Sequence, residues 1–122
     1  MIMMQEEVRI VPQLIEPNAV AEALFAAGRC VLHVDGRCVT CSVDGEYVNG
    51  VADSWADVVS VVNTAVSQFV CQYMADVVEP HMTAQELATD VARYFGVLPS
   101  QETAVALLVG WAEQFTVKEL NL

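Results

Sequence analysis

The stretch from Cys30 to Val51 reads CVLHVDGRCVTCSVDGEYVNGV, and it decides the fold class of this 122-residue chain. Two Asp-Gly pairs, Asp35-Gly36 and Asp44-Gly45, divide it into three runs that are rich in β-branched residues. An Asp-Gly pair favours the two-residue type I′ turn, in which both central residues have a positive φ. The sequence therefore predicts an antiparallel three-stranded meander over residues 30–34, 37–43 and 46–51.

Two such turns also predict the register of the strands. Leu32 should lie opposite Val39, Cys30 opposite Cys41, and His33 opposite Cys38. One face of the sheet then carries an apolar set: Cys30, Leu32, Val34, Val39, Cys41, Val43 and Val48. The other face is mostly polar: Val31, His33, Cys38, Thr40, Ser42, Tyr47 and Asn49. An antiparallel sheet with one covered face and one wet face has this pattern.

Helical patterns flank the meander on both sides. Apolar residues recur at helical spacing over residues 17–27 before Gly28, and again over residues 55–78 after Ser54. The second helix would be about 36 Å long, and we expect it to cover the apolar face of the sheet. A Thr83-Ala84-Gln85-Glu86 capping box begins a helix that ends at Gly96, and a last helix runs from residues 100–102 to about Phe115.

A short alternating run at residues 6–11, ended by Pro12, predicts an additional edge strand. The expected fold class is α+β: a small antiparallel three- to four-stranded sheet covered by a long amphipathic helix, plus a C-terminal helical pair. The length fits one domain, so we expect residues 1–122 to form a single α+β domain.

Composition excludes several classes of protein. Sixteen acidic residues against five basic ones give a formal charge of −11, which argues against a broad phosphate-binding face. The longest apolar run, residues 104–112, is too short to span a membrane, and the first residues have no basic region of a secretory signal. We therefore expect a cytoplasmic protein whose four cysteines are reduced thiols.

One segment has the residue types of a zinc site: Cys38-Val39-Thr40-Cys41, with His33 and Cys30 nearby. Alternation along regular strands places two of these ligands on each face, so one metal ion could not collect all four. His33 opposite Cys38 is the one pair that could act as a nucleophile and its base, but the pattern predicts no acid to orient the histidine. We therefore expect no metal, no cofactor and no catalytic residues, with a Cys/His-dependent enzyme as an alternative.

Residues 92–100, between the last two helices, resemble the turn of a helix-turn-helix unit. The resemblance covers about a quarter of the chain and implies a second helix lying in the major groove of DNA. That helix begins with Gln101, Glu102 and Thr103 and then becomes apolar, so it lacks the basic side chains of a DNA reader. An ordinary helical hairpin is the favoured interpretation, and DNA binding is an alternative.

The last helix is apolar nearly all round, and such a helix is either central in a core or covered by another molecule. A homodimeric scaffold or assembly protein is therefore an alternative function. Its expected interface residues are Val105, Leu108, Val109 and Trp111.

The favoured function is a small acidic, non-catalytic protein-binding domain. Its acidic residues are spread along the chain, nine in residues 1–60 and seven in residues 61–122, which suits docking on a basic, nucleic-acid-binding surface of a partner protein. Inhibitors of this kind include phage anti-defence proteins and immunity proteins. The expected contacts lie near the sheet edge and on the wet side of the long helix: Glu46, Asp53, Asp57 and Asp76.

Overall fold

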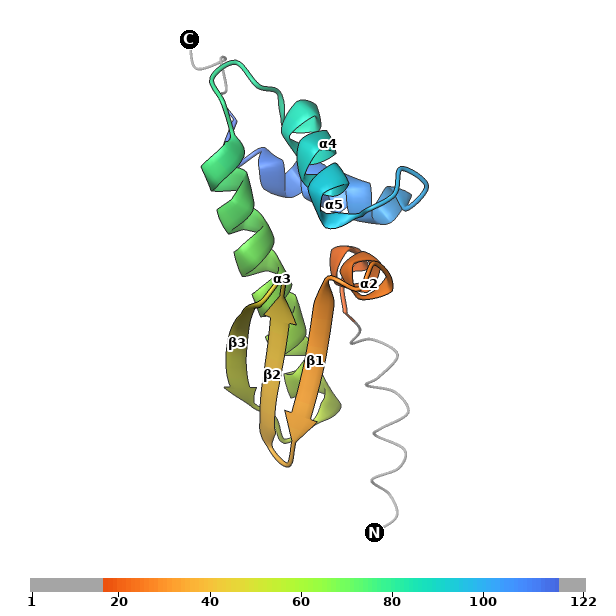
Figure 1. Ribbon diagram of the computed structural model, residues 1–122, viewed down its shortest axis with the longest axis vertical. Helices are drawn as coiled ribbons and strands as arrows, with labels where there is room; N and C mark the ends of the chain where they lie inside the picture. The colour runs from red at the N-terminus through yellow and green to blue at the C-terminus, as the bar shows by residue number, and fades with distance from the viewer. Residues whose placement is uncertain (1–16, 117–122) are drawn as a thin grey trace.

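The computed structural model describes residues 17–116 as an α+β fold. The element order is α2 (Ala19–Ala26), β1 (Cys30–Asp35), β2 (Cys38–Val43), β3 (Glu46–Val51), α3 (Trp55–Val77), α4 (Ala84–Phe95) and α5 (Glu102–Ala112). The three strands form an antiparallel meander in the order β1-β2-β3 (Figure 1). The predicted three-stranded sheet, long helix and C-terminal helical pair are confirmed, whereas the strand predicted at residues 6–11 lies outside the described residues.

The second hairpin has the predicted turn. Val43 pairs with Glu46, and the two residues between them, Asp44 and Gly45, have φ values of +52° and +91°. Positive φ at both central residues is the type I′ pattern, and it places Cys41 opposite Val48 as the sequence predicts.

The first hairpin differs, and its predicted register is wrong. Asp35 pairs with Cys38, so the two-residue loop is Gly36-Arg37, and only Gly36 has a positive φ, +64°. This is the type II′ pattern, in which glycine rather than aspartate takes the left-handed position. The loop adds one residue pair to the hairpin, and Arg37 is held by hydrogen bonds from its Nε and Nη2 to Asp53 at 2.6 and 3.1 Å.

The new register places Cys30 opposite Val43, Leu32 opposite Cys41, and His33 opposite Thr40. Each residue of β1 is shifted by two positions along β2 relative to the prediction. Because side chains alternate with a period of two, a two-residue shift leaves every side chain on its predicted face. The apolar and polar faces of the sheet are therefore as expected, although the individual partners are not.

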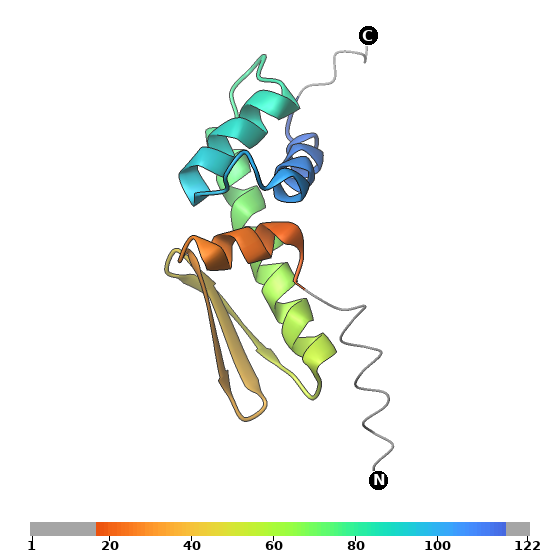
Figure 2. The same cartoon turned by 90° about the vertical axis from the view of Figure 1, so that its right-hand side faces the viewer.

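The core lies between the apolar face of the sheet and α3. Figure 2 shows the sheet and α3 as two adjacent layers, with α2 crossing their upper part. Cys41 and Val43 of β2 are buried in the same apolar cluster as Val62 and Val66 of α3. Burial of such side chains stabilises the fold by roughly 1.5–3 kcal/mol each.

The upper part of α3 continues past the sheet, where α4 and α5 pack as a pair and α2 lies between the pair and the sheet (Figures 1 and 2). The capping box of Thr83 and Glu86 is present, and α4 ends at Gly96 with a φ of +81°. Helix α5 ends at Ala112, three residues before the predicted end at Phe115.

Helix α3 alone among the described helices has the length and mean hydropathy, 23 residues and 1.2, of a membrane-spanning helix. In the sequence the longest uninterrupted apolar run is residues 104–112, because polar residues interrupt the apolar pattern of α3. In the structure α3 packs on β2 and β3, and it buries six side chains: Val59, Val62, Ala65, Val66, Val70 and Met74. Its polar residues lie on another side of the helix, as in the core helix of a folded domain.

We predict opposite effects for alanine at two glycines. Gly96→Ala should destabilise the protein by about 1–2 kcal/mol, because Gly96 has a left-handed φ and an added Cβ would lie 3.1 Å from the Cβ of Ala27. Gly110→Ala should stabilise it by about 0.5–1 kcal/mol, because this position is inside α5 and open space surrounds it. Urea unfolding measures both changes, and a stabilised Gly96→Ala variant would contradict the described end of α4.

Candidate functional site

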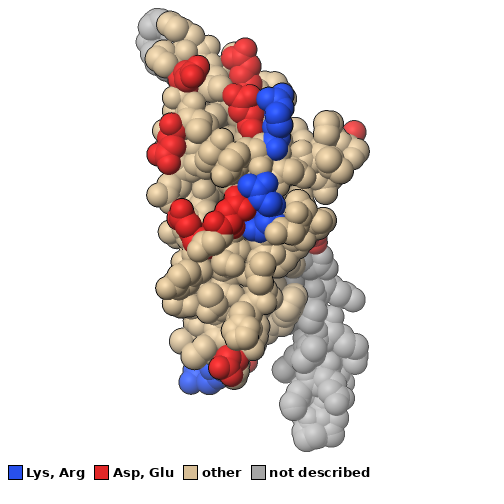
Figure 3. All heavy atoms as spheres, viewed as in Figure 1, with Lys and Arg blue, Asp and Glu red and all other residues tan. Residues whose placement is uncertain are grey.

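A hollow of about 170 Å³ lies where the β2–β3 turn meets the C-terminal part of α3 and the end of α4. Two of the predicted contact residues, Glu46 and Asp76, line this hollow. Its full lining is Val43, Asp44, Glu46, Phe69, Gln72, Tyr73, Asp76, Tyr94 and Phe95, and we call it the acidic hollow. Figure 3 shows acidic side chains together at this level of the molecule, next to basic ones.

The local fold explains why the two carboxylates meet. Glu46 is the first residue of β3, directly after the type I′ turn, and Asp76 is in the last turn of α3. The hairpin and the helix pack side by side, so residues 30 positions apart in the sequence reach one hollow. Both residues are exposed, and no ion pair joins either of them to a cation within residues 17–116.

The third carboxylate of the hollow, Asp44, is neutralised from within the protein. The Nε and Nη2 atoms of Arg29 donate to its two oxygens at 2.6 and 2.7 Å, which is a bidentate ion pair. Hydrogen bonding to Asp44 raises the pKa of Arg29. The remaining Nη1 donates to the carbonyl oxygen of Tyr94 at 2.6 Å, so one guanidinium joins the start of β1, the β2–β3 turn and α4.

Aromatic rings form one wall of the acidic hollow. The rings of Tyr73 and Tyr94 are stacked, with centroids 4.2 Å apart, and Phe95 meets both edge-on. The Arg29 guanidinium carbon lies 5.1 Å from the centre of the Tyr94 ring, within the range of a cation–π interaction. The protein thus already binds one of its own cations here with a carboxylate and an aromatic face.

The other two predicted contacts, Asp53 and Asp57, lie at the far end of the sheet. Asp53 forms an ion pair with Arg37 at 2.6 Å. The Oδ2 atom of Asp57 accepts a hydrogen bond from the backbone N–H of Asp53 at 2.9 Å, and the backbone N–H of Asp57 donates to the Oγ of Ser54. These contacts hold the connection from β3 to α3, so the structure does not bring these residues together with Glu46 and Asp76.

Tyr73, Tyr94 and Arg29 are members of the site that were not predicted from the sequence. The two tyrosines occupy apolar positions of their helices, which is the pattern of ordinary core residues. Nothing in the spacing indicates that residue 94 lies beside residue 73, because that contact depends on how α4 returns along α3. The position of Asp44 is explained by the Asp44-Gly45 turn, so nothing in the sequence indicates its ion pair with Arg29.

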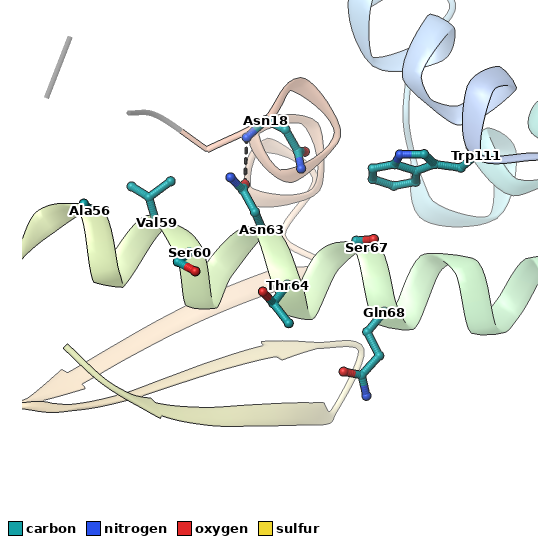
Figure 4. Close-up of a pocket in the computed structure, with 9 residues that line it drawn as sticks. All are labelled: Asn18, Ala56, Val59, Ser60, Asn63, Thr64, Ser67, Gln68 and Trp111. Carbon is teal, nitrogen blue, oxygen red and sulfur yellow. Dashed lines mark hydrogen bonds between the residues drawn. The ribbon is translucent and has the colours of Figure 1, made fainter. Parts of the chain in front are cut away.

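A second, larger hollow of about 740 Å³ runs along α3 beneath α2 and α5 (Figure 4). It is a broad groove lined mainly by hydroxyl and amide side chains: Asn18, Ser60, Asn63, Thr64, Ser67 and Gln68. The Oδ1 atom of Asn63 accepts a hydrogen bond from the backbone N–H of Asn18 at 2.9 Å, and the indole of Trp111 projects toward Ser67 from α5 (Figure 4). Among the described residues, its lining includes no charged side chain, cysteine or histidine.

The predicted pairing of His33 with Cys38 is wrong, because the first hairpin closes at Gly36-Arg37. Cys38 pairs with Asp35 and Val51, and His33 pairs with Thr40. Both side chains are exposed on the uncovered face of the sheet. Within the part of the chain that the structure describes, no three His, Cys, Asp or Glu side chains are close enough together to hold a metal ion.

The residues of the expected dimer interface divide between two environments. Leu108 is 1% exposed and belongs to the core, on the inward face of α5 with Ala104 and Ala112. Val105, Val109 and Trp111 are partly exposed and pack at the edge of that core. An interface on α5 stays a prediction for these three residues, whereas Leu108 is covered by the protein itself.

The acidic hollow offers carboxylate oxygens and aromatic faces, which are the groups that bind cations. No family model matches this chain, and searches of curated proteins and of solved structures find no significant similarity. The chemistry of the candidate site is therefore judged from its geometry alone.

We predict that Arg29→Ala destabilises the protein by about 1–2 kcal/mol. The change removes a bidentate ion pair, the bond to the Tyr94 carbonyl and a cation–π contact, from side chains that are only 29% and 28% exposed. Arg93→Ala is the matched control, because Arg93 and its partner Asp90 are 74% and 50% exposed and 3.5 Å apart, so we expect little change. Equal unfolding midpoints for the two variants in urea would contradict the structural role of Arg29.

Sedimentation velocity tests the predicted homodimer interface on α5. If Val105, Val109 and Trp111 form a homodimer interface, the sedimentation coefficient should rise with concentration, and Val109→Glu should abolish that rise by placing a charge in an apolar contact. A monomer at every concentration would remove the homodimer hypothesis.

Proposed function

We propose that this protein is a non-catalytic binding module that recognises another protein and receives a lysine or arginine side chain of that partner in the acidic hollow. One observation carries the proposal: Glu46 and Asp76, without a cation of their own in the described residues, line a hollow that has an aromatic wall. A long basic side chain can place its charge between carboxylates and lay its stem along aromatic rings.

The charge balance supports a basic partner. Each of the three arginines in residues 17–116 is paired with an aspartate: Arg29 with Asp44, Arg37 with Asp53, and Arg93 with Asp90. The protein's own cations are therefore already neutralised where the structure describes them, while the chain carries a net charge of −11. Such a field accelerates encounters with a positively charged surface and repels nucleic acid and acidic proteins.

The kind of partner follows from the same chemistry. Surfaces that are dense in lysine and arginine are typical of proteins that bind nucleic acid phosphates. An acidic module docked on such a surface would compete with the phosphates, so we propose that it acts as an inhibitor of its partner. Phage anti-defence proteins and immunity proteins are examples of this class of activity.

The lining of the hollow favours binding over catalysis. Its residues include no cysteine, histidine or serine, so the hollow offers no pairing of such a nucleophile with a histidine base. Its polar groups are carboxylates, an amide and two phenols, and Arg29 holds one of the carboxylates in an ion pair.

A lysine-rich peptide is the direct probe of the hollow. In an NMR titration at low salt, we expect the largest shifts at Glu46, Tyr73, Asp76 and Tyr94. The double substitution E46Q/D76N should weaken binding about tenfold, because two charge interactions are lost, and added salt should weaken the binding of the original protein.

The matched control is E22Q/D35N, which removes the same charge from exposed acids outside the hollow. Equal weakening by both double variants would mean that only the overall charge matters and would refute a specific hollow. Binding that does not depend on salt would refute the electrostatic mechanism. Capture from a cell lysate at low and high salt, with the original protein and E46Q/D76N in parallel, then identifies the partner by mass spectrometry.

A further inference from the structure

Two buried cysteines lie in contact between the sheet and the helices. Cys30 is the first residue of β1 and Cys41 is near the middle of β2, and their Sγ atoms are 3.5 Å apart. They are diagonal neighbours across the two strands, since Cys30 pairs with Val43 and Cys41 pairs with Leu32. Their residues are 4% and 0% exposed, and both are free thiols.

Both thiols lie in an apolar cluster, and each thiol contacts the sulfur atom of the other. Cys30 and Cys41 both belong to the apolar core cluster, with the side chains of α2 and α3 packed against them. The two sulfurs form a hydrogen bond in which either thiol can donate. This contact lowers the pKa of Cys41, whereas the same contact and burial raise the pKa of Cys30. Cys41 is therefore the thiol that ionises first, and Cys30 remains beside it as a second thiol.

The other two cysteines are separate from this pair. Cys38 is exposed on the opposite face of the sheet, and Cys71 is half-buried on α3. The contact between Cys30 and Cys41 joins residues of two strands whose positions are fixed by the backbone ladder.

We propose that Cys30 and Cys41 are a modification site, at which hydrogen peroxide converts the dithiol into a disulfide that cross-links β1 to β2. Burial selects a small oxidant, because the thiols are reached only through brief local openings of the structure. A second thiol within 3.5 Å captures the first oxidation product before it is oxidised further.

The reaction balances in two steps. The Cys41 thiolate attacks one oxygen of the peroxide, the O–O bond breaks, and the departing hydroxide takes up a proton to become water, which leaves a sulfenic acid on Cys41. The Cys30 sulfur then gives up its proton and attacks the Cys41 sulfur, the S–O bond breaks, and a second water leaves. In total two thiols are oxidised to one disulfide and one hydrogen peroxide is reduced to two waters.

A disulfide bond is about 2.05 Å long, so the two sulfurs must approach by roughly 1.5 Å. Diagonal neighbours on antiparallel strands are about 7–8 Å apart, beyond the roughly 4.4–6.8 Å between Cα atoms that is usual for a disulfide. Rotation of the two side chains must therefore be accompanied by an inward shift of the start of β1, next to the Gly28 turn. The closed ring would restrict the unfolded chain, so we expect the oxidised protein to melt several degrees higher than the reduced one.

The test uses the full chain with C38S/C71S, which retains only the buried pair. After treatment with hydrogen peroxide, we expect loss of two hydrogen atoms by mass spectrometry, a cross-linked peptide containing Cys30 and Cys41, no thiol available to alkylation after unfolding, and reversal by dithiothreitol. The control C30S/C38S/C71S should instead form a sulfenic acid on Cys41 that dimedone traps. The original sequence, with peptide mapping, provides the same readout if the double variant is poorly folded.

Three results would overturn the proposal. The first is that Cys30 and Cys41 remain free at a peroxide concentration that oxidises the exposed Cys38 completely. The second is a disulfide that joins either residue to Cys38, to Cys71 or to another chain. The third is a disulfide that forms only in denaturant, or one that lowers the melting temperature.

Discussion

The packing of α3 on one face of a short sheet is the constraint on which the rest of the structure depends. Strands of six residues span about 20 Å, whereas a helix of 23 residues spans about 34 Å. The helix therefore extends past the sheet by roughly two fifths of its length. The apolar residues of this extension need a cover of their own, and α4, α5 and α2 supply it. The acidic hollow lies where the sheet ends and the side of α3 is open toward α4.

One arginine, Arg29, forms an ion pair at the place where the sheet ends beside α3. The chain has sixteen acids and five bases. Arg29 contacts a turn, a helix end and two aromatic rings, and its side chain is largely covered. Arg37 and Arg93 form more exposed pairs, which contribute little to stability. Glu46 and Asp76, beside Arg29, have no ion pair within the described residues, and the proposed function depends on them.

The alternation of side chains along β2 separates two kinds of cysteine. Cys38 faces solvent, whereas Cys41, three residues later, faces the core together with Cys30 of the neighbouring strand. The same alternation prevents the four potential zinc ligands, Cys30, His33, Cys38 and Cys41, from gathering on one face. A motif that looks like a metal site in the linear sequence therefore becomes an exposed thiol on one side and a buried dithiol on the other.

The sequence by itself determined the elements and their faces, because these depend on local chemistry and on periodicity. The caps at Asn18, Ser54 and Thr83, the left-handed glycines and the Asp44-Gly45 turn all act within a few residues. Tertiary structure decided the first hairpin, because Asp35-Gly36 and Gly36-Arg37 can both form two-residue loops, and the second gives the longer ladder. It also decided the acidic hollow: Glu46, Asp76 and Tyr94 are distant in sequence, and only the path of α4 beside α3 brings their side chains to one place.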